Sequence, residues 1–187
     1  MEKTKELSTK VITGKVRFSY LHVFEPTSIN DQEGSQKKYS VSLVIQKSDK
    51  VTLKAINDAI TIAKEQGKSK KWGGKIPAKL KMPLRDGDEE RPEDEVYKNA
   101  FFVNASSPTK PTLVDRDMNL ITDPADLYSG CYGRASISFF AFNKAGNLGI
   151  ACGLNHLQKM QDGEALGGRT SVDEDFTPIE GDDDDLM

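Results

Sequence analysis

The sequence predicts a mainly β fold, an antiparallel barrel or sandwich of five to seven strands with one main α-helix. Apolar and polar residues alternate along several segments, which is typical of half-buried strands. Only one segment has the apolar spacing of a helix, so the alternating helices of a parallel sheet are missing. The 187 residues are enough for one domain with an additional tail.

The first strand is expected at 11–20, where Val16, Phe18 and Tyr20 share one face. The polar residues 26–38 then indicate a loop. Residues 39–45 have the clearest strand pattern of the chain, because apolar side chains alternate there with serines.

One helix is expected after these strands. Ser48 can cap it, Asp49 suits its first turn, and Gly67 can end it. Its apolar face consists of Leu53, Ile56, Ala59, Ile60 and Ala63. Residues 68–92 contain several glycines and prolines without a sustained period, so we expect a long ordered loop there.

The second half of the chain again predicts strands. They are expected at 97–105 and 112–115, the latter followed by a turn. The best hairpin joins 130–142 to 148–157 through 143–147, whose Asn and Gly residues tolerate positive φ. The chain has no internal repeat.

Charge is unevenly distributed along the chain. The formal net charge is -3, but residues 171–187 hold eight acids and no Lys or Arg, which leaves the remainder at +5. We therefore expect a flexible N-terminus at 1–10, one domain at 11–170 and a disordered acidic tail at 171–187. A basic body of this kind attracts polyanions.

The composition argues against several other classes of protein. The two cysteines, Cys131 and Cys152, are too few for a disulfide framework and suit buried, reduced thiols. No apolar run is long enough for a membrane span, and the first residues lack a signal-peptide core. These observations favour a cytoplasmic protein without a membrane partner.

The segment 64–81 is the first candidate for nucleic-acid binding. It carries seven lysines, one acid and the only tryptophan, Trp72. Lysines neutralise phosphates, and an exposed aromatic ring stacks on unpaired bases. In the alternative interpretation the lysines are merely solvated and Trp72 anchors the loop to the core.

The segment 130–142 is the second candidate. One of its faces is apolar, whereas the other mixes rings, hydroxyls and a guanidinium, a mixture typical of surfaces that bind single strands. Tyr132 and Arg134 lie beside glycines and favour binding, while Phe140 and Phe142 favour a second packed face.

An enzymatic alternative comes from the acids of 86–95. Asp86, Asp88 and Glu89 could hold Mg²⁺ for a nuclease or a recombination enzyme. Their density in a Pro-containing, charged loop favours a solvated surface instead, and no other cofactor or metal is expected. A third class, a protein-interaction module whose acids imitate DNA, also remains open.

Four segments, in their order along the chain, resemble a family of bacteriophage single-stranded DNA-binding proteins. They are 11–20 (VITGKVRFSY), 72–77 (WGGKIP), 83–92 (PLRDGDEERP) and 128–135 (YSGCYGRA). The resemblance extends from about Lys10 to Arg169 and implies an OB-fold barrel that binds single-stranded DNA without catalysis. The acidic terminus is similar to the tails of other replication single-strand binders, which recruit protein partners.

The combined expectation is a sequence-tolerant single-stranded DNA-binding protein of phage replication or recombination, acting in the bacterial cytoplasm. Its oligomeric state is open, with a homodimer as one alternative. The expected DNA-binding residues are Lys15, Arg17, Lys68, Lys70, Lys71, Trp72, Lys75, Lys79, Arg85, Tyr132 and Arg134. The residues expected to bind replication or recombination proteins are Asp182, Asp183, Asp184, Asp185 and Leu186.

Overall fold

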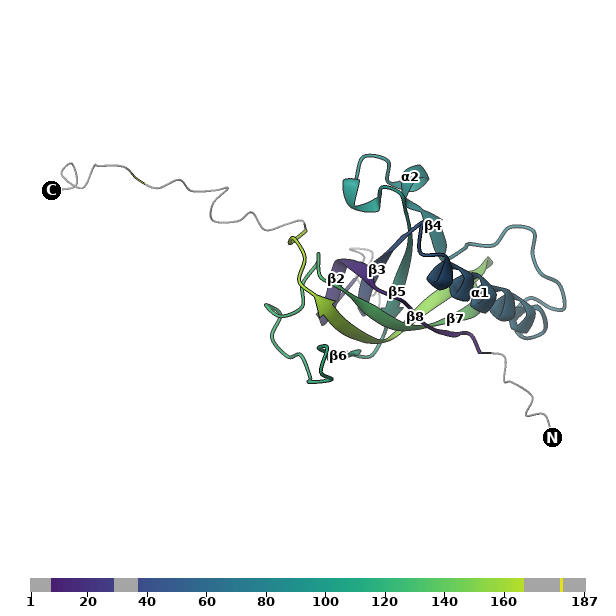
Figure 1. Ribbon diagram of the computed structural model, residues 1–187. Coiled ribbons are helices and arrows are strands. Elements are labelled where there is room, and N and C mark those ends of the chain that lie inside the picture. Colours follow the sequence, from purple (N-terminus) through teal and green to yellow (C-terminus); the bar gives the residue numbers. More distant parts are fainter. Residues whose placement is uncertain (1–7, 29–36, 167–178, 180–187) are drawn as a thin grey trace, which may run out of the picture.

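The computed structural model describes residues 8–28, 37–166 and 179 (Figure 1). Eight strands, two α-helices and one 3-10 helix make up this part of the chain. In order they are β1 (Lys10–Ile12), β2 (Val16–Thr27), β3 (Lys38–Gln46), α1 (Lys50–Lys70), β4 (Leu84–Asp86), α2 (Gly87–Glu90), η1 (Glu95–Tyr97), β5 (Ala100–Ser107), β6 (Thr112–Val114), β7 (Tyr132–Lys144) and β8 (Asn147–Gln161).

Five strands close into a barrel in the order β2, β3, β5, β8 and β7, with β7 pairing back to β2. All of these pairings are antiparallel except that of β5 with β8, which is parallel at Ser106 and Gly153. This is the arrangement of an OB-fold. The short strands β1, β4 and β6 extend the sheet along β7, β5 and β8, which gives eight strands where five to seven were expected.

The predicted alternation is confirmed in the core. Val41, Leu43 and Ile45 of β3 are buried in the main apolar cluster. On β7 the buried set includes Ala135, Ile137 and Phe139, as the sequence indicated. The hairpin is tighter than expected, because only Ala145 and Gly146, both with positive φ, separate β7 from β8.

The predicted first strand is divided in two. Thr13 to Lys15 separate β1 from β2, because the backbone there bonds to other elements. The Thr13 amide donates to the carbonyl of Ala135, and the Gly14 amide donates to the Thr52 hydroxyl of α1. The single predicted strand therefore pairs with β7 twice, once on each side of this break.

Helix α1 packs against β7 and β1, and its predicted apolar face is buried. The side chain that caps it is Asp49 rather than Ser48, since Asp49 accepts from the Thr52 amide at 3.1 Å. Gly67 does not end the helix, which continues to Lys70. A Cβ at Gly67 would lie 2.4 Å from that of Ala141, so the glycine allows α1 to approach β7 closely.

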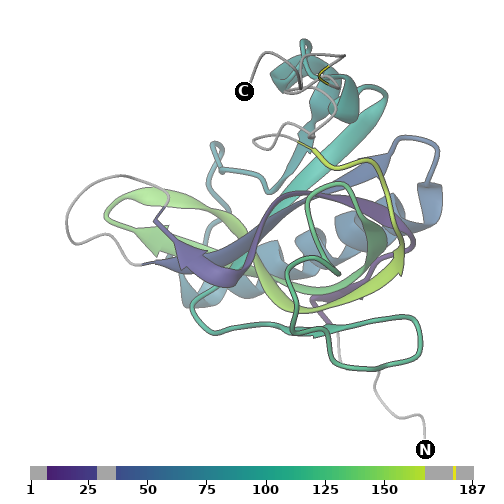
Figure 2. The same cartoon turned by 90° about the vertical axis from the view of Figure 1, so that its left-hand side faces the viewer.

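The expected irregular segment 68–92 contains regular structure. Residues 84–98 form β4, α2 and η1, which rise above the sheet in Figures 1 and 2. A second apolar cluster, Val44, Tyr97, Ala100 and Phe102, fixes this segment to the outer face of β3 and β5. The buried Tyr97 hydroxyl donates to the Ser42 hydroxyl at 3.0 Å.

Both thiols, Cys131 and Cys152, are free and buried, as expected. Burial raises the pKa of the Cys152 thiol. Neither helix of the described residues is long and apolar enough to cross a bilayer. Apart from Ile179, the predicted tail at 171–187 lies outside the described residues, as do residues 1–7 of the predicted N-terminal segment.

In Gly67→Ala the added methyl group overpacks the contact with Ala141, at a cost of about 1–3 kcal/mol. Since alanine raises helix propensity by about 1 kcal/mol, we expect a net destabilisation of up to about 2 kcal/mol. Urea unfolding measures the difference, and Ser69→Ala at an exposed position nearby is the control. A more stable Gly67→Ala protein would show that α1 can move away from β7 at little cost.

Candidate nucleic-acid interface

The outer side of β2, β3 and β5 forms a groove, which we call the front groove, and the segment 87–97 is its wall. Tyr97 packs edge-on against Phe102, with ring centroids 5.1 Å apart and an interplanar angle of 82°. These two buried rings cover part of the sheet and leave the rest open. In an OB-fold this face of the barrel is the one that receives single strands.

Arg91 lies in the wall and faces three aromatic rings. Its guanidinium carbon is 5.2 Å from the Tyr20 ring centroid, 4.8 Å from that of Tyr97 and 5.0 Å from that of Phe102. Cation–π attraction of this kind holds a guanidinium in place without neutralising it. Within the part of the chain that the structure describes, no carboxylate pairs with Arg91, so its charge is available to an anion.

Tyr20 is the exposed ring of the front groove, with 53% of its surface accessible. The sequence pattern placed it on the buried face with Val16 and Phe18, and that expectation is wrong. The β2–β3 register shifts between Ser19 and His22, and Tyr20 has a φ of 47°. This bulge turns the ring out of the core.

Two hollows flank Tyr20. One, of about 460 Å³, is lined by Arg91 together with the polar side chains Ser40, Ser42, Asn104 and Ser106. The other, of about 510 Å³, includes Ser19, His22 and Asp94. A flat ring between two hollows that carry hydroxyl and amide groups can stack a base and hydrogen-bond its edge.

Three of the predicted DNA-binding residues meet at one corner of the barrel. The Lys15 ammonium and the Arg17 guanidinium lie 5.5 and 5.2 Å from the centroid of the Tyr132 ring. Arg17 also donates to the carbonyls of Gly130 and Glu164, at 3.2 and 3.0 Å. On β2, Arg17 is two residues before Ser19 of the front groove, so this corner adjoins that groove.

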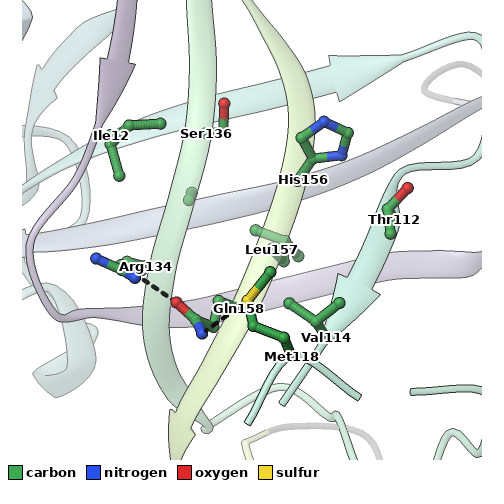
Figure 3. Close-up of a pocket in the computed structure, with 10 residues that line it drawn as sticks. Ile12, Thr112, Val114, Met118, Arg134, Ser136, His156, Leu157 and Gln158 are labelled. Carbon is green, nitrogen blue, oxygen red and sulfur yellow. Dashed lines mark hydrogen bonds between the residues drawn. The ribbon is translucent and has the colours of Figure 1, made fainter. Parts of the chain in front are cut away.

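Arg134 follows Tyr132 along the outer face of β7. It is exposed, and its Nε donates to Oε1 of Gln158 on β8. Figure 3 shows this pair on the floor of a further hollow, which Ile12 borders on one side and Val114 and Met118 on the other. Arg134 is therefore separate from the hollows that flank Tyr20.

The lysine-rich segment comprises the last turns of α1 and the loop that follows, beside the β7–β8 hairpin (Figure 1). The Trp72 indole donates to the Phe142 carbonyl at 3.1 Å and contacts the main core, so the ring anchors the loop. Five predicted lysines of this segment are exposed, namely Lys68, Lys70, Lys71, Lys75 and Lys79. They do not line either of the hollows beside Tyr20.

Two of the three acids proposed for the enzymatic alternative, Asp86 and Asp88, interact with a lysine. The Lys47 ammonium lies 2.9 Å from Asp86 and 2.7 Å from Asp88. Hydrogen bonds from Lys47 lower the pKa of both carboxyls, and the same bonds raise the pKa of Lys47. The two carboxylates thus hold the base of the wall, while the predicted DNA-binding residue Arg85 contacts Glu90 at 3.3 Å.

Sequence reasoning missed Tyr20 and Arg91. Both occur in the segments that carry the family resemblance, but neither has a local signal that separates it from a core tyrosine or a solvated arginine. Only the bulge in β2 and the packing of segment 87–97 bring the two side chains together. The sequence offered one signal, namely that both residues belong to the long motifs that carry the family resemblance. This signal does not indicate where their side chains lie.

Comparison with solved structures supports the fold. A TM-score of 0.74 relates this chain to the single-stranded DNA-binding protein from bacteriophage Enc34 in complex with ssDNA, at 22% identity over 89% of this chain and 97% of that chain. The single-stranded DNA-binding protein gp2.5 of bacteriophage T7 matches with a TM-score of 0.63, at 13% identity over 93% of this chain and 97% of that chain.

Sequence comparison extends the similarity to phage proteins. Protein p50 of Acyrthosiphon pisum secondary endosymbiont phage 1 is 29% identical over 177 residues, which cover 88% of this chain and 91% of p50. The family model described as "Enterobacter phage Enc34, ssDNA-binding protein" matches residues 9–187. This is a family of binding proteins without enzymatic activity, and it does not favour the nuclease alternative. The chain therefore belongs to the phage Enc34 ssDNA-binding protein family.

Proposed function

We propose that this protein binds single-stranded DNA in the front groove, with little preference for sequence, during phage DNA replication or recombination in the bacterial cytoplasm. The observation that carries the proposal is the exposed Tyr20 ring between two hollows, backed by Arg91. Every base has a face that can stack on such a ring, so the mode of binding is sequence-tolerant.

The sugar–phosphate backbone would be held by cations beside the groove. Lys15 and Arg17 lie at the adjoining corner, where Tyr132 offers a second ring. Arg134 and Arg85 are proposed as further phosphate contacts, and so are the lysines of segment 68–79. Trp72 would position that segment, since its indole donates a hydrogen bond to the Phe142 carbonyl.

Partner recruitment is proposed for the acidic tail at 171–187. An acidic run followed by apolar residues, Asp182 to Leu186, suits a basic and apolar surface on a replication or recombination protein. In this division of the chain, residues 11–170 bind DNA and the tail binds proteins. The acids of the tail would also compete with DNA for a body of charge +5.

A salt titration tests the proposed function. We expect the full chain to shift labelled single strands without cleaving them, with or without Mg²⁺, and to prefer them to duplex of the same length. Affinity should fall as salt rises, with a slope of about 0.7 in log Kd against log salt for each phosphate contact. A flat salt response, or a duplex that competes equally well, would contradict the proposal.

Tyr20→Ala should weaken binding by about 1–3 kcal/mol, the usual contribution of one stacked base. The ring is exposed, so we expect the urea midpoint to change little. Tyr20→Phe keeps the ring and should retain most of the affinity, and Val51→Ala, exposed on α1, is the control. If Tyr20→Ala bound single strands as wild type does, the front groove would not be the site.

Deleting residues 171–187 should tighten binding to single strands, and most strongly at low salt, where attraction between tail and body is least screened. Fluorescence titrations of the full and shortened chains at two salt concentrations measure this change. Equal affinities at low salt would mean that the tail does not compete with DNA. Weaker binding by the shortened chain would mean that residues beyond 170 contribute to the DNA site.

A further inference from the structure

The outer face of β7 carries a row of side chains that the front groove does not use. Arg134, Ser138 and Phe140 alternate with buried residues of the strand and point away from the core, whereas Ser136 between them is buried. Arg134 is exposed, and Phe140 leaves 50% of its surface accessible. An exposed guanidinium, a half-buried hydroxyl that accepts from the Asn155 amide at 3.0 Å, and a free ring thus lie along a single strand.

Two adjoining hollows lie along this row. The first, of about 440 Å³, includes Arg134, and the second, of about 470 Å³, includes Ser138. Ser136 and His156 line both, so the hollows form one continuous trough, part of which Figure 3 shows. We call this trough the β7 trough.

Cations border the β7 trough, and none of the aspartate or glutamate side chains that the structure describes lines it. Arg134 lies in its first hollow, and Lys10 and Lys110 lie in its second. Among the described residues, none of these three cations takes part in an ion pair. The trough therefore has the charge that a polyanion requires.

The two ends of β7 lie beside the two groups of cations predicted from the sequence. Its first residue, Tyr132, contacts Lys15 and Arg17 at the corner that adjoins the front groove. Near its other end, Asn143 donates to the carbonyl of Lys71 in the lysine-rich segment, at 3.3 Å. The 13 residues of β7 span about 43 Å at the usual rise of a strand.

We propose that the β7 trough is a second track for the same DNA strand, which leaves the front groove at Tyr132 and continues along β7 toward the lysine-rich segment. This inference rests on the proposed function. A strand of nucleotides fits better than an acidic peptide, because the unpaired cations are spaced along the trough together with hydroxyls. The free ring of Phe140 lies outside the two hollows, two residues beyond Ser138 on the same strand. Phosphates would meet Arg134, Lys10 and Lys110, and a base would stack on Phe140.

Oligonucleotides of two lengths test this track in the full chain. An OB-fold covers roughly 4–16 nucleotides of a single strand. A strand of about 6 nucleotides lies near the lower limit of this range, whereas one of about 30 nucleotides exceeds it. The test variant is Lys10→Glu with Lys110→Glu. The matched control is Lys50→Glu with Lys54→Glu, two charge reversals on the exposed surface of α1.

For the long strand, we expect the double variant to bind about tenfold more weakly and the salt slope to fall by about 1.4, which corresponds to 0.7 for each lost phosphate contact. Affinity for the short strand should stay within twofold of wild type, and Phe140→Ala should likewise weaken only the long strand. The control double variant should change neither affinity.

An equal loss of affinity for the short and the long strand would overturn the second track, because it would reflect only the general charge of the protein. Unchanged binding of the long strand would overturn it as well and would leave an acidic peptide as the better occupant of the trough. Failure of the wild-type protein to bind a strand of either length would instead contradict the proposed function, so the two failures can be distinguished.

Discussion

The pairing of β7 with three other strands is the constraint on which the rest of this structure depends. β7 pairs with β2 and β8 to close the barrel, and β1 pairs with its middle residues. Its inward side chains complete the core and provide the surface on which Gly67 lets α1 pack. Because strand side chains alternate, closing the core in this way necessarily leaves a second row of side chains facing outward.

The wall of the front groove is held by two kinds of interaction. Tyr97 and Phe102 bury apolar surface on the sheet, and burial of aromatic rings contributes several kcal/mol in most proteins. The contacts of Lys47 with Asp86 and Asp88 are partly exposed, and such pairs contribute little to stability. Packing therefore stabilises the wall, whereas the ion pairs mainly orient its base.

Lowering the pH should weaken the ion pairs of Lys47 with Asp86 and Asp88 before it affects the packing of the wall. The pKa values of Asp86 and Asp88 are lower in the folded state than in the unfolded state. The contribution of these carboxylates to stability is therefore complete above their unfolded pKa values and is lost as the pH falls through their folded pKa values. The pKa of Lys47 is raised in the folded state, so the contribution of its charge to stability is lost only when the pH rises to strongly alkaline values. Between these limits the base of the wall keeps its geometry.

Alternation along the chain was enough to predict most strands and their buried faces, because a half-buried strand leaves that pattern wherever it is regular. The helix α1 was predicted from the helical spacing of its apolar residues and from its capping signals, although the role of Gly67 depends on how closely Ala141 approaches. The site was harder to predict. Tyr20 follows the core pattern of β2 in the sequence, and only a change of register reverses its direction. The wall was missed because its apolar residues, Val96 and Tyr97, are too few to form a period and pack on a distant strand.

The Arg91 guanidinium beside Tyr20 has a consequence for how a bound strand could move. Because a cation already lies against the ring, a base in the proposed site would compete for the remaining surface and would not be enclosed on both sides. The neighbouring hydroxyls of Ser40 and Ser106 can rotate, so each can donate to or accept from whichever base edge is present. Neither contact distinguishes one nucleotide from the next. A strand held in the proposed way would recover the same interactions after advancing by one nucleotide, and the protein would then diffuse along DNA without dissociating.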